Sequence, residues 1–203
     1  MSFHLSEQTI TRRLEAAYRP GTVASADGYA EMYAGAALTC AAVLLPLARW
    51  HDEWHLLFTR RTEAVEHHKG QVSFPGGACD AGDGTPEATA LRETREEIGL
   101  DPADVRLLGR LNDYLTITRY RITPVVGVIP YPFEFKLEKA EVGRAFTIPL
   151  AWLARRENWD EQSMTPNRKQ RPFPVIVYHP YDGEVLWGAS ARITHYFLKI
   201  LEL

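Results

Sequence analysis

The chain has few cysteines, a small net charge and no long apolar run, and each shortage excludes a class of protein. Among its 203 residues there are only two cysteines, Cys40 and Cys79. Two are too few for a disulfide framework or for a zinc site of known spacing, so we expect free thiols, with Cys40 buried. The net charge of −3 gives no global basic field that would attract nucleic acid or an anionic membrane. No apolar run approaches the roughly 18 residues of a membrane span, and the first residues lack the apolar segment of a signal peptide, so we expect a cytoplasmic protein.

What is present is the composition of an ordinary folded domain, 45% hydrophobic and 24% charged. Residues 6–18 have a candidate Ser6 N-cap and apolar side chains at helical spacing, which predicts an amphipathic helix. We expect residues 1–35 to form an N-terminal helical extension and residues 36–203 the main domain. The patterning of that domain predicts an α/β (α+β) fold, a mixed β-sheet packed between helices.

Apolar runs give the expected strands and their order. Residues 39–48 and 54–61 read as a hairpin of buried strands, and a helix closes the chain within 185–203. Pro124 is expected to place its strand at a sheet edge or a bulge, because proline cannot donate a ladder hydrogen bond. Residues 161–172 are expected to form a loop. The remaining strand candidates are 105–111, 122–129 and 173–179.

One short helix carries an unusual group of acids in the sequence PEATALRETREEIGL, residues 86–100. Thr85 and Pro86 are suited to begin the helix and Gly99 to end it. Ala88, Leu91 and Ile98 are expected to pack on the sheet. Glu93, Glu96 and Glu97 then share another face, where like charges at these spacings repel by a few tenths of a kcal/mol per pair. Either this face is a solvated surface, or its hard oxygen ligands, next to a glycine-rich loop, bind Mg²⁺ or Mn²⁺.

The stretch from Gly77 to Leu100 resembles the Nudix box, G-x5-E-x7-R-E-U-x-E-E-x-G-U with U apolar. Arg92, Glu93, Glu96, Glu97 and Gly99 match it residue for residue, as do Gly77 and Leu100. Three departures are visible: Asp83 replaces a glutamate, one extra residue precedes Arg92, and Thr94 occupies an apolar position. The resemblance implies the Nudix fold, with its strand-loop-helix catalytic motif, and a metal-dependent hydrolase.

Residues 56–83 resemble the upstream signature of coenzyme A pyrophosphatases within that superfamily, roughly L-L-T-x-R-[SA]-x3-R-x3-G-x3-F-P-G-G. Thr59, Arg61 and the run ending in Gly76 and Gly77 fit it, whereas Thr62 and Glu66 do not, and Glu66 is acidic where the signature is basic. The resemblance implies hydrolysis of coenzyme A or acyl-CoA to 3′,5′-ADP and 4′-phosphopantetheine. Because of Glu66, other nucleoside diphosphate derivatives (ADP-ribose, NADH, nucleotide sugars) remain alternatives, as does a catalytically silent nucleotide sensor.

The resemblance also assigns expected roles. Glu93 and Glu97 would bind the metal together with the Gly77 carbonyl, Glu96 would be a further ligand or the general base, and Arg92 would orient the cluster. Glu141 is the alternative general base, unless it is an ordinary surface glutamate. Contacts to a small-molecule substrate are expected from Arg61, His68 and Lys69, and a homodimer is left open. The motif residues Gly76, Gly77, Asp83 and Gly99 would shape the loop and the helix end.

Overall fold

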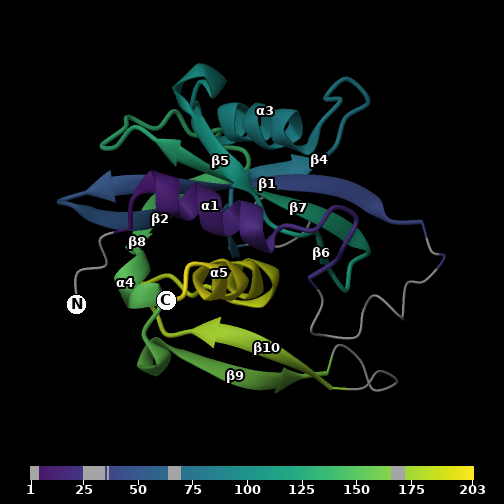
Figure 1. Cartoon of the computed structure of the whole chain (residues 1–203), viewed down its shortest axis with the longest axis vertical. Coiled ribbons are helices and arrows are strands. Elements are labelled where there is room, and N and C mark those ends of the chain that lie inside the picture. The colour runs from purple at the N-terminus through teal and green to yellow at the C-terminus, as the bar shows by residue number, and fades with distance from the viewer. Residues whose placement is uncertain (1–4, 25–34, 36, 64–69, 166–171) are drawn as a thin grey trace.

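A mixed β-sheet forms the middle layer of the protein, which we describe from a computed structural model covering residues 5–24, 35, 37–63, 70–165 and 172–203 (Figure 1). The helices are α1 (Glu7–Ala17), α3 (Pro86–Ile98), α4 (Leu150–Leu153) and α5 (Gly188–Ile200), with 3₁₀ turns η1 (Pro102–Asp104) and η2 (Arg156–Asn158). The strands are β1 (Thr39–Trp50), β2 (Glu53–Arg61), β3 (Val72–Ser73), β4 (Gly76–Ala78), β5 (Arg106–Arg110), β6 (Tyr114–Leu115), β7 (Tyr120–Ile129), β8 (Val142–Pro149), β9 (Trp159–Met164) and β10 (Phe173–Tyr178).

The main sheet has eight strands, and its path runs β3-β2-β1-β7-β5. Strand β1 pairs with β7 in parallel and with β2 and β4 in antiparallel fashion, so the predicted mixed sheet and the β1–β2 hairpin are confirmed. Strand β8 extends the sheet beyond β2, and β6 pairs with β7. The catalytic-box candidate β4-loop-α3 thus starts from the middle of the sheet.

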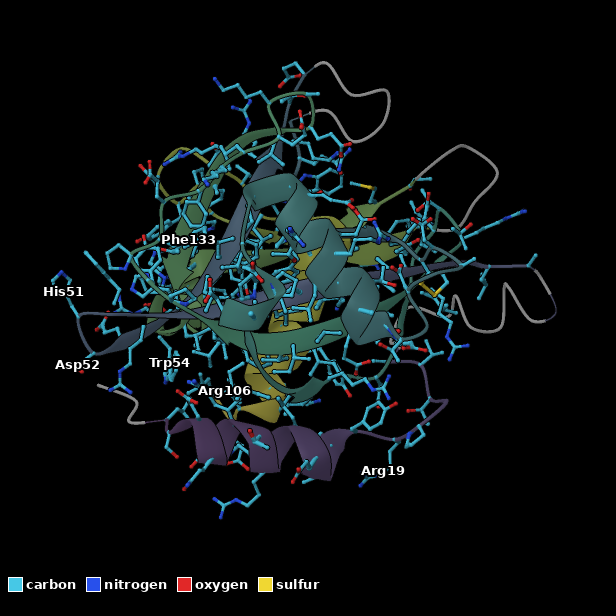
Figure 2. All side chains as sticks on the ribbon, turned by 90° about the horizontal axis from the view of Figure 1, so that it is seen from above. Arg19, His51, Asp52, Trp54, Arg106 and Phe133 are labelled. Carbon is cyan, nitrogen blue, oxygen red and sulfur yellow. A yellow bond between two sulfur atoms is a disulfide. The ribbon has the colours of Figure 1, made fainter. Side chains whose placement is uncertain are left out.

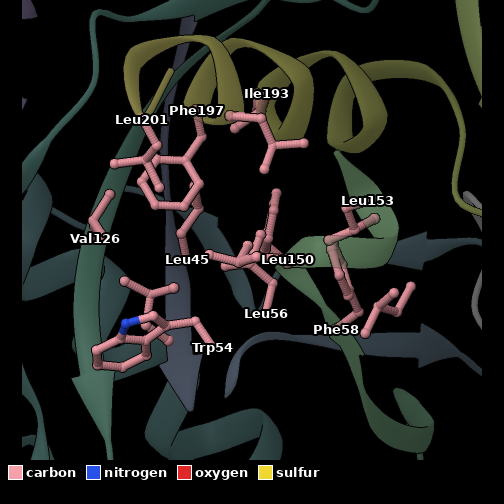
Figure 3. Close-up of a cluster of buried hydrophobic side chains, with 14 of the residues drawn as sticks. Leu45, Trp54, Leu56, Phe58, Val126, Leu150, Leu153, Ile193, Phe197 and Leu201 are labelled. Atoms are coloured by element: carbon pink, nitrogen blue, oxygen red, sulfur yellow. The ribbon is translucent and has the colours of Figure 1, made fainter. Parts of the chain in front are cut away.

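Helix α3 covers one face of the sheet and α5 covers the other, whereas α1 packs alongside the edge strand β5 and against α5 (Figure 1). A separate two-stranded sheet, β9 with β10, lies on the far side of α5. The larger core cluster fills the space between the sheet and α5, where Phe197 and Ile193 face Leu45 and Leu56 (Figure 3). Burying each such side chain contributes about 1.5–3 kcal/mol. No helix in the described part of the chain is long and apolar enough to cross a membrane.

The predicted amphipathic helix is confirmed as α1, and it packs on this core. The Ser6 side chain accepts a hydrogen bond from the Thr9 amide at 3.1 Å, and Ile10 and Leu14 are fully buried in the larger cluster. Arg106 of β5 holds Glu7 in a bidentate ion pair with distances of 2.6 and 2.8 Å, beside α1 in Figure 2. The N-terminal helix therefore shares its core with the domain expected from residue 36 onward.

Two strand expectations need correction. Pro124 lies in β7, between β1 and β5, so its strand is not at an edge, although the β5–β7 ladder does contain a register shift, between Leu107 and Gly109. The Pro124 carbonyl accepts a hydrogen bond from the Leu111 amide, so this residue faces the break between β5 and β6. Proline is tolerated there because no strand residue at the break needs a hydrogen bond from its missing N–H. The expected loop at 161–172 also begins with a strand, since β9 pairs with β10 through the polar residues Asp160 to Ser163.

The expectation of free cysteines is wrong as well, because Cys40 and Cys79 form a disulfide. The β1–β4 register pairs Ala41 with Ala78, so the two cysteines face each other one step further along, with Cα atoms 5.4 Å apart. Cys40 is exposed and not buried. A separation of 39 residues gave no local signal of this pairing. The disulfide attaches the loop after β4 to β1.

Candidate functional site

The strand-loop-helix unit has the ends that the sequence predicts. Thr85 caps α3 by accepting a hydrogen bond from the Ala88 amide at 3.1 Å, and Gly99 ends it in the left-handed conformation with φ of 74°. In β4, Gly76 has φ of 151°, and a Cβ there would lie 2.4 Å from the Ala42 carbonyl oxygen. Only glycine fits at that position.

The buried face of α3 differs in phase from the expectation. Its buried residues are Thr89, Ala90, Thr94, Glu97 and Ile98. Ile98 packs inward as predicted, but the prediction for Ala88 and Leu91 is wrong. These two side chains are half-buried and line an open hollow of about 590 Å³ together with Arg92, Arg95, Glu96 and Pro102. Thr94 is accommodated inside because its hydroxyl donates to the Ala90 carbonyl at 2.6 Å.

Arg92 is the centre of the polar network on α3. Its Nε and Nη2 donate to the two oxygens of Asp83 at 2.8 and 3.0 Å, so the shorter aspartate does reach the helix. Its Nη1 donates to Glu93 at 2.8 Å and to Glu96 at 3.1 Å, and Nη2 also donates to the Ala78 carbonyl. The hydrogen bonds from Arg92, followed by those from Asp80 and Thr89, hold the pKa of Asp83 well below its usual range.

Glu93 is placed against the bare backbone of Gly77. A Cβ at Gly77 would lie 2.5 Å from the Glu93 carboxylate, so a glycine is required for this approach. Burial raises the pKa of Glu93, and the hydrogen bond and charge of Arg92 oppose that shift. The Glu93 carboxylate therefore lies against the β4 backbone. A carboxylate and a backbone carbonyl that bind the same cation must lie close together in this way.

Glu97 is the most deeply buried acid of the described residues, with 5% of its surface exposed. Its Oε2 accepts from the Gly76 amide at 3.3 Å, and its Oε1 lies 3.9 Å from Arg61 Nη1. Burial raises the pKa of Glu97 to about 8, and these two interactions offset only part of the shift. The charged form of Glu97 thus lacks sufficient compensation in the protein alone.

The third acid, Glu96, has a different environment. Its side chain is 59% exposed and turned toward Arg92 at the rim of the hollow. In the described ranges, no three acidic, histidine or cysteine side chains already converge as a metal site. The donor set nevertheless fits Mg²⁺ or Mn²⁺, because Glu93 and Glu97 are carboxylates next to the β4 backbone and burial penalises their charge.

Glu141 lies on a loop that contacts both α3 and β2. The Glu138 amide donates to the Glu97 carbonyl at 2.9 Å. Thr62 holds the other side, since its amide donates to the Glu141 carbonyl at 2.8 Å and its hydroxyl to the Ala140 carbonyl at 2.9 Å. The Glu141 side chain is 52% exposed, and its Oε2 lies 3.6 Å from Arg61 Nη2.

The structure thus brings together Glu93, Glu97, Gly77, Arg61 and Glu141. Glu96 shares the Arg92 guanidinium with Glu93 but is much more exposed. His68 and Lys69 lie outside the described residues. The contacts that sequence reasoning missed are the Gly76 amide on Glu97 and the Thr62 hydroxyl on the Glu141 loop. The only sequence signal for the second is the position of Thr62 directly after Arg61.

Comparison with known proteins identifies the family of the chain. The model of the NUDIX domain family matches residues 39–166, which is more than half of the chain. A protein described as an uncharacterized Nudix hydrolase, NudL, from Klebsiella pneumoniae is 42% identical over 153 residues, covering 75% of this chain and 78% of that protein. NudL of Escherichia fergusonii is 42% identical over 158 residues, covering 78% and 74% respectively.

Solved structures agree on the fold. A MutT protein from Methanosarcina mazei Go1 superposes with a TM-score of 0.50 at 16% identity, covering 81% of this chain and 93% of that one. A MutT/nudix family protein from Enterococcus faecalis gives a TM-score of 0.50 at 13% identity, covering 98% and 75%. With the family model, the relatives and the fold in agreement, the chain belongs to the Nudix family of hydrolases.

Proposed function

We propose that this chain is a divalent-metal-dependent hydrolase of a nucleoside diphosphate derivative, with coenzyme A or acyl-CoA as the favoured substrate. The observation that carries the metal-dependent reaction is the buried, under-compensated Glu97 next to Glu93 and the β4 backbone. A carboxyl group buried in this way is either protonated or paired with a cation, and a bound cation keeps it ionised. The coenzyme A preference rests on the signature around residues 56–83.

Glu93, Glu97 and the Gly77 carbonyl would hold Mg²⁺ or Mn²⁺, with Glu96 as a further candidate ligand. When bound, such an ion neutralises diphosphate oxygens and lowers the pKa of a water molecule. Arg92 keeps Glu93 oriented toward Gly77, since its Nη1 donates to Glu93 while Asp83 fixes the rest of the guanidinium. The protein contribution is therefore mainly positioning and charge, as in other phosphoryl transfers.

The proposed hydrolysis consumes one water molecule. The water oxygen attacks one phosphorus of the diphosphate, the bond from that phosphorus to the bridging oxygen breaks, and the second phosphate leaves with that oxygen. Glu141 takes the proton from the water in this scheme, because its exposed carboxylate lies at the site and belongs to a loop held at both ends. Glu96 is the alternative base, and it is disfavoured because it accepts a hydrogen bond from Arg92 at 3.1 Å, whereas the contact between Arg61 and Glu141, at 3.6 Å, is longer than a hydrogen bond.

The described signature residues differ in what they contribute. Thr59 and Phe74 are buried, the first donating to the Ser73 carbonyl at 3.3 Å and the second stacked on Phe58 at 4.7 Å between ring centroids. Both stabilise the sheet. Arg61 instead faces the carboxylates, where a guanidinium can contact phosphate oxygens.

A substrate panel tests the proposal. Coenzyme A, dephospho-CoA, ADP-ribose, NADH and a nucleotide sugar would be incubated with Mg²⁺ or Mn²⁺ and the products identified by mass. We expect 3′,5′-ADP and 4′-phosphopantetheine from coenzyme A, with kcat/KM above that for dephospho-CoA. Faster hydrolysis of ADP-ribose or NADH, with equal rates on coenzyme A and dephospho-CoA, would favour the alternative substrates. These are the substrates suggested by the acidic Glu66 in place of the basic residue of the signature. Binding without turnover of any substrate would indicate a silent sensor.

A further inference from the structure

Arg61 is the one described cation that approaches both Glu97 and Glu141. It is the last residue of β2, where the ladder with β8 shifts register between Arg60 and Arg61. Its neighbour Arg60 contacts a different set of acids, Glu63 at 3.2 Å and Glu184 at 3.5 Å. Two adjacent arginines therefore serve separate networks, and only Arg61 belongs to the site.

The contacts of Arg61 are electrostatic but poorly hydrogen-bonded. Nη1 lies 3.9 Å from Glu97 and Nη2 3.6 Å from Glu141, both longer than a hydrogen bond. Its Nε is buried and has no hydrogen-bond partner within the described ranges. An unsatisfied buried donor costs free energy, so this conformation of Arg61 is held by charge and is inexpensive to leave.

A single guanidinium also compensates Glu97 incompletely. Glu97 is 5% exposed, the Gly76 amide donates to its carboxylate at 3.3 Å, and Arg61 stays beyond hydrogen-bond distance at 3.9 Å. One positive charge is shared here between two carboxylates, with Glu93 close to the same backbone. A divalent cation would neutralise this group better than Arg61 does.

We propose that Arg61 is an exchangeable counter-cation: it occupies Glu97 and Glu141 in the metal-free protein, and metal binding displaces its guanidinium so that it can bind the diphosphate. This inference rests on the proposed function of the same site. In this exchange the metal ion binds first, and the diphosphate binds second, once Arg61 has been released. It also frees Glu141 from an ion pair that would oppose its role as a base.

A purely structural salt bridge would have the opposite signature. If Arg61 only supports the positions of Glu97 and Glu141, its removal should weaken metal binding or leave it unchanged. If Arg61 competes with the metal, removal of its charge must strengthen metal binding, because like charges no longer repel. The direction of the change in affinity therefore separates the two roles.

The first experiment measures Mn²⁺ binding without substrate, by electron paramagnetic resonance or calorimetry at pH 7.5. We expect Arg61→Gln and Arg61→Met to bind Mn²⁺ roughly threefold to tenfold more tightly than the wild type. Arg61→Lys keeps the charge and should remain near the wild type, as should the control Arg60→Gln. The Met variant retains the apolar stem, so it serves if the Gln variant folds poorly.

Unchanged or weaker Mn²⁺ binding in both neutral variants would overturn the exchange. Failure of the wild type to bind Mn²⁺ at millimolar concentration would instead overturn the metal site itself, so the two failures are distinguishable.

The second experiment tests the release of Arg61 with ADP as a probe, comparing wild type and Arg61→Gln under the same conditions. In EDTA we expect little difference in ADP affinity, because Arg61 is engaged by carboxylates. In Mg²⁺ we expect the variant to bind ADP about tenfold more weakly. An equal loss in both conditions, or a loss in neither, would contradict the release.

Discussion

Arg92 and Asp83 form a bidentate ion pair, with Nε to Oδ1 at 2.8 Å and Nη2 to Oδ2 at 3.0 Å. This pair links the loop after β4 to the helix that carries the carboxylates. Asp83 also accepts from the Asp80 amide at 2.9 Å and from the Thr89 hydroxyl at 2.8 Å. The loop geometry thus depends on the ionised form of Asp83.

Asp83→Asn should lower the melting temperature by a few degrees at neutral pH. The folded-state pKa of Asp83 is lowered below its ordinary value of 3.8, so its contribution is present above that value and is lost as the pH falls through the folded pKa. Thermal melts across pH 2.5–7.5 should therefore show a gap between wild type and variant that narrows below about pH 4. A gap independent of pH would contradict the ionic origin of this contribution.

Glu97→Gln should raise stability in EDTA at alkaline pH. The folded pKa of about 8 exceeds the ordinary value of 4.5, so the protonated form favours folding, and stability falls as the pH rises from 4.5 through 8. A neutral glutamine avoids this loss, which is at most a few kcal/mol, or about 5–10 °C for a protein of this size. Wild type and variant should melt together near pH 5 and diverge by pH 9.

The control for this measurement is Glu96→Gln. The Glu96 side chain is 59% exposed, so its replacement should change the pH dependence of melting little. A second arm adds millimolar Mn²⁺, which should raise the melting temperature of wild type and not of Glu97→Gln. Equal stabilisation of both proteins would place the metal elsewhere.

Thr62→Val should reduce kcat by roughly threefold to tenfold and leave KM nearly unchanged. Valine keeps the shape but removes the hydrogen bond to the Ala140 carbonyl, so the loop that carries Glu141 is held less firmly. Thr62→Ser retains a hydroxyl and should restore most of the rate. Steady-state kinetics on both variants provide the test.

A double-mutant cycle identifies how Thr62 acts. In a Glu141→Gln background, Thr62→Val should have no further effect on kcat if it acts through Glu141. An undiminished effect there would show that Thr62 does not position Glu141. A Glu141→Gln variant with the wild-type rate would transfer the role of base to Glu96 or another group.

Glu66→Arg should widen the preference for coenzyme A over dephospho-CoA. The signature has a basic residue at position 66, and the 3′-phosphate carries about two negative charges at neutral pH. The ratio of kcat/KM values should grow about tenfold for each ~1.4 kcal/mol of added discrimination. Glu66→Gln is the matched control, which removes the acid without adding a base. If neither change alters the ratio of kcat/KM values, the residue at position 66 does not take part in recognising the 3′-phosphate.

Local signals in the sequence predicted much of the fold. Thr85, Pro86 and Gly99 define α3 because caps depend on adjacent residues, and the apolar runs of β1 and β2 define a hairpin. Which face of α3 is buried could not be predicted in this way. Hydrophobic patterning places a glutamate on the exposed face, but Glu97 is buried because it belongs to the site. Strand β9 was not predicted because its residues are mostly polar and exposed, so it lacks the apolar pattern of a strand.

Contacts between residues far apart in the sequence were also not predicted. The Cys40–Cys79 disulfide depends on the β1–β4 register, and the Arg61–Glu97 contact joins the end of β2 to the end of α3. Neither relation has a signature in residue spacing. The acids of the box could be predicted as a group, but only burial separates Glu97 and Glu93 from the exposed Glu96.

The turnover of Glu97→Gln at saturating Mg²⁺ or Mn²⁺ measures whether Glu97 and Glu93 hold the catalytic cation on a chain that folds without it. We predict that kcat on the best substrate of the panel falls by roughly 10³-fold or more, while circular dichroism and the EDTA melt show a folded protein. A folded Glu97→Gln protein with kcat within about tenfold of the wild type would contradict the account.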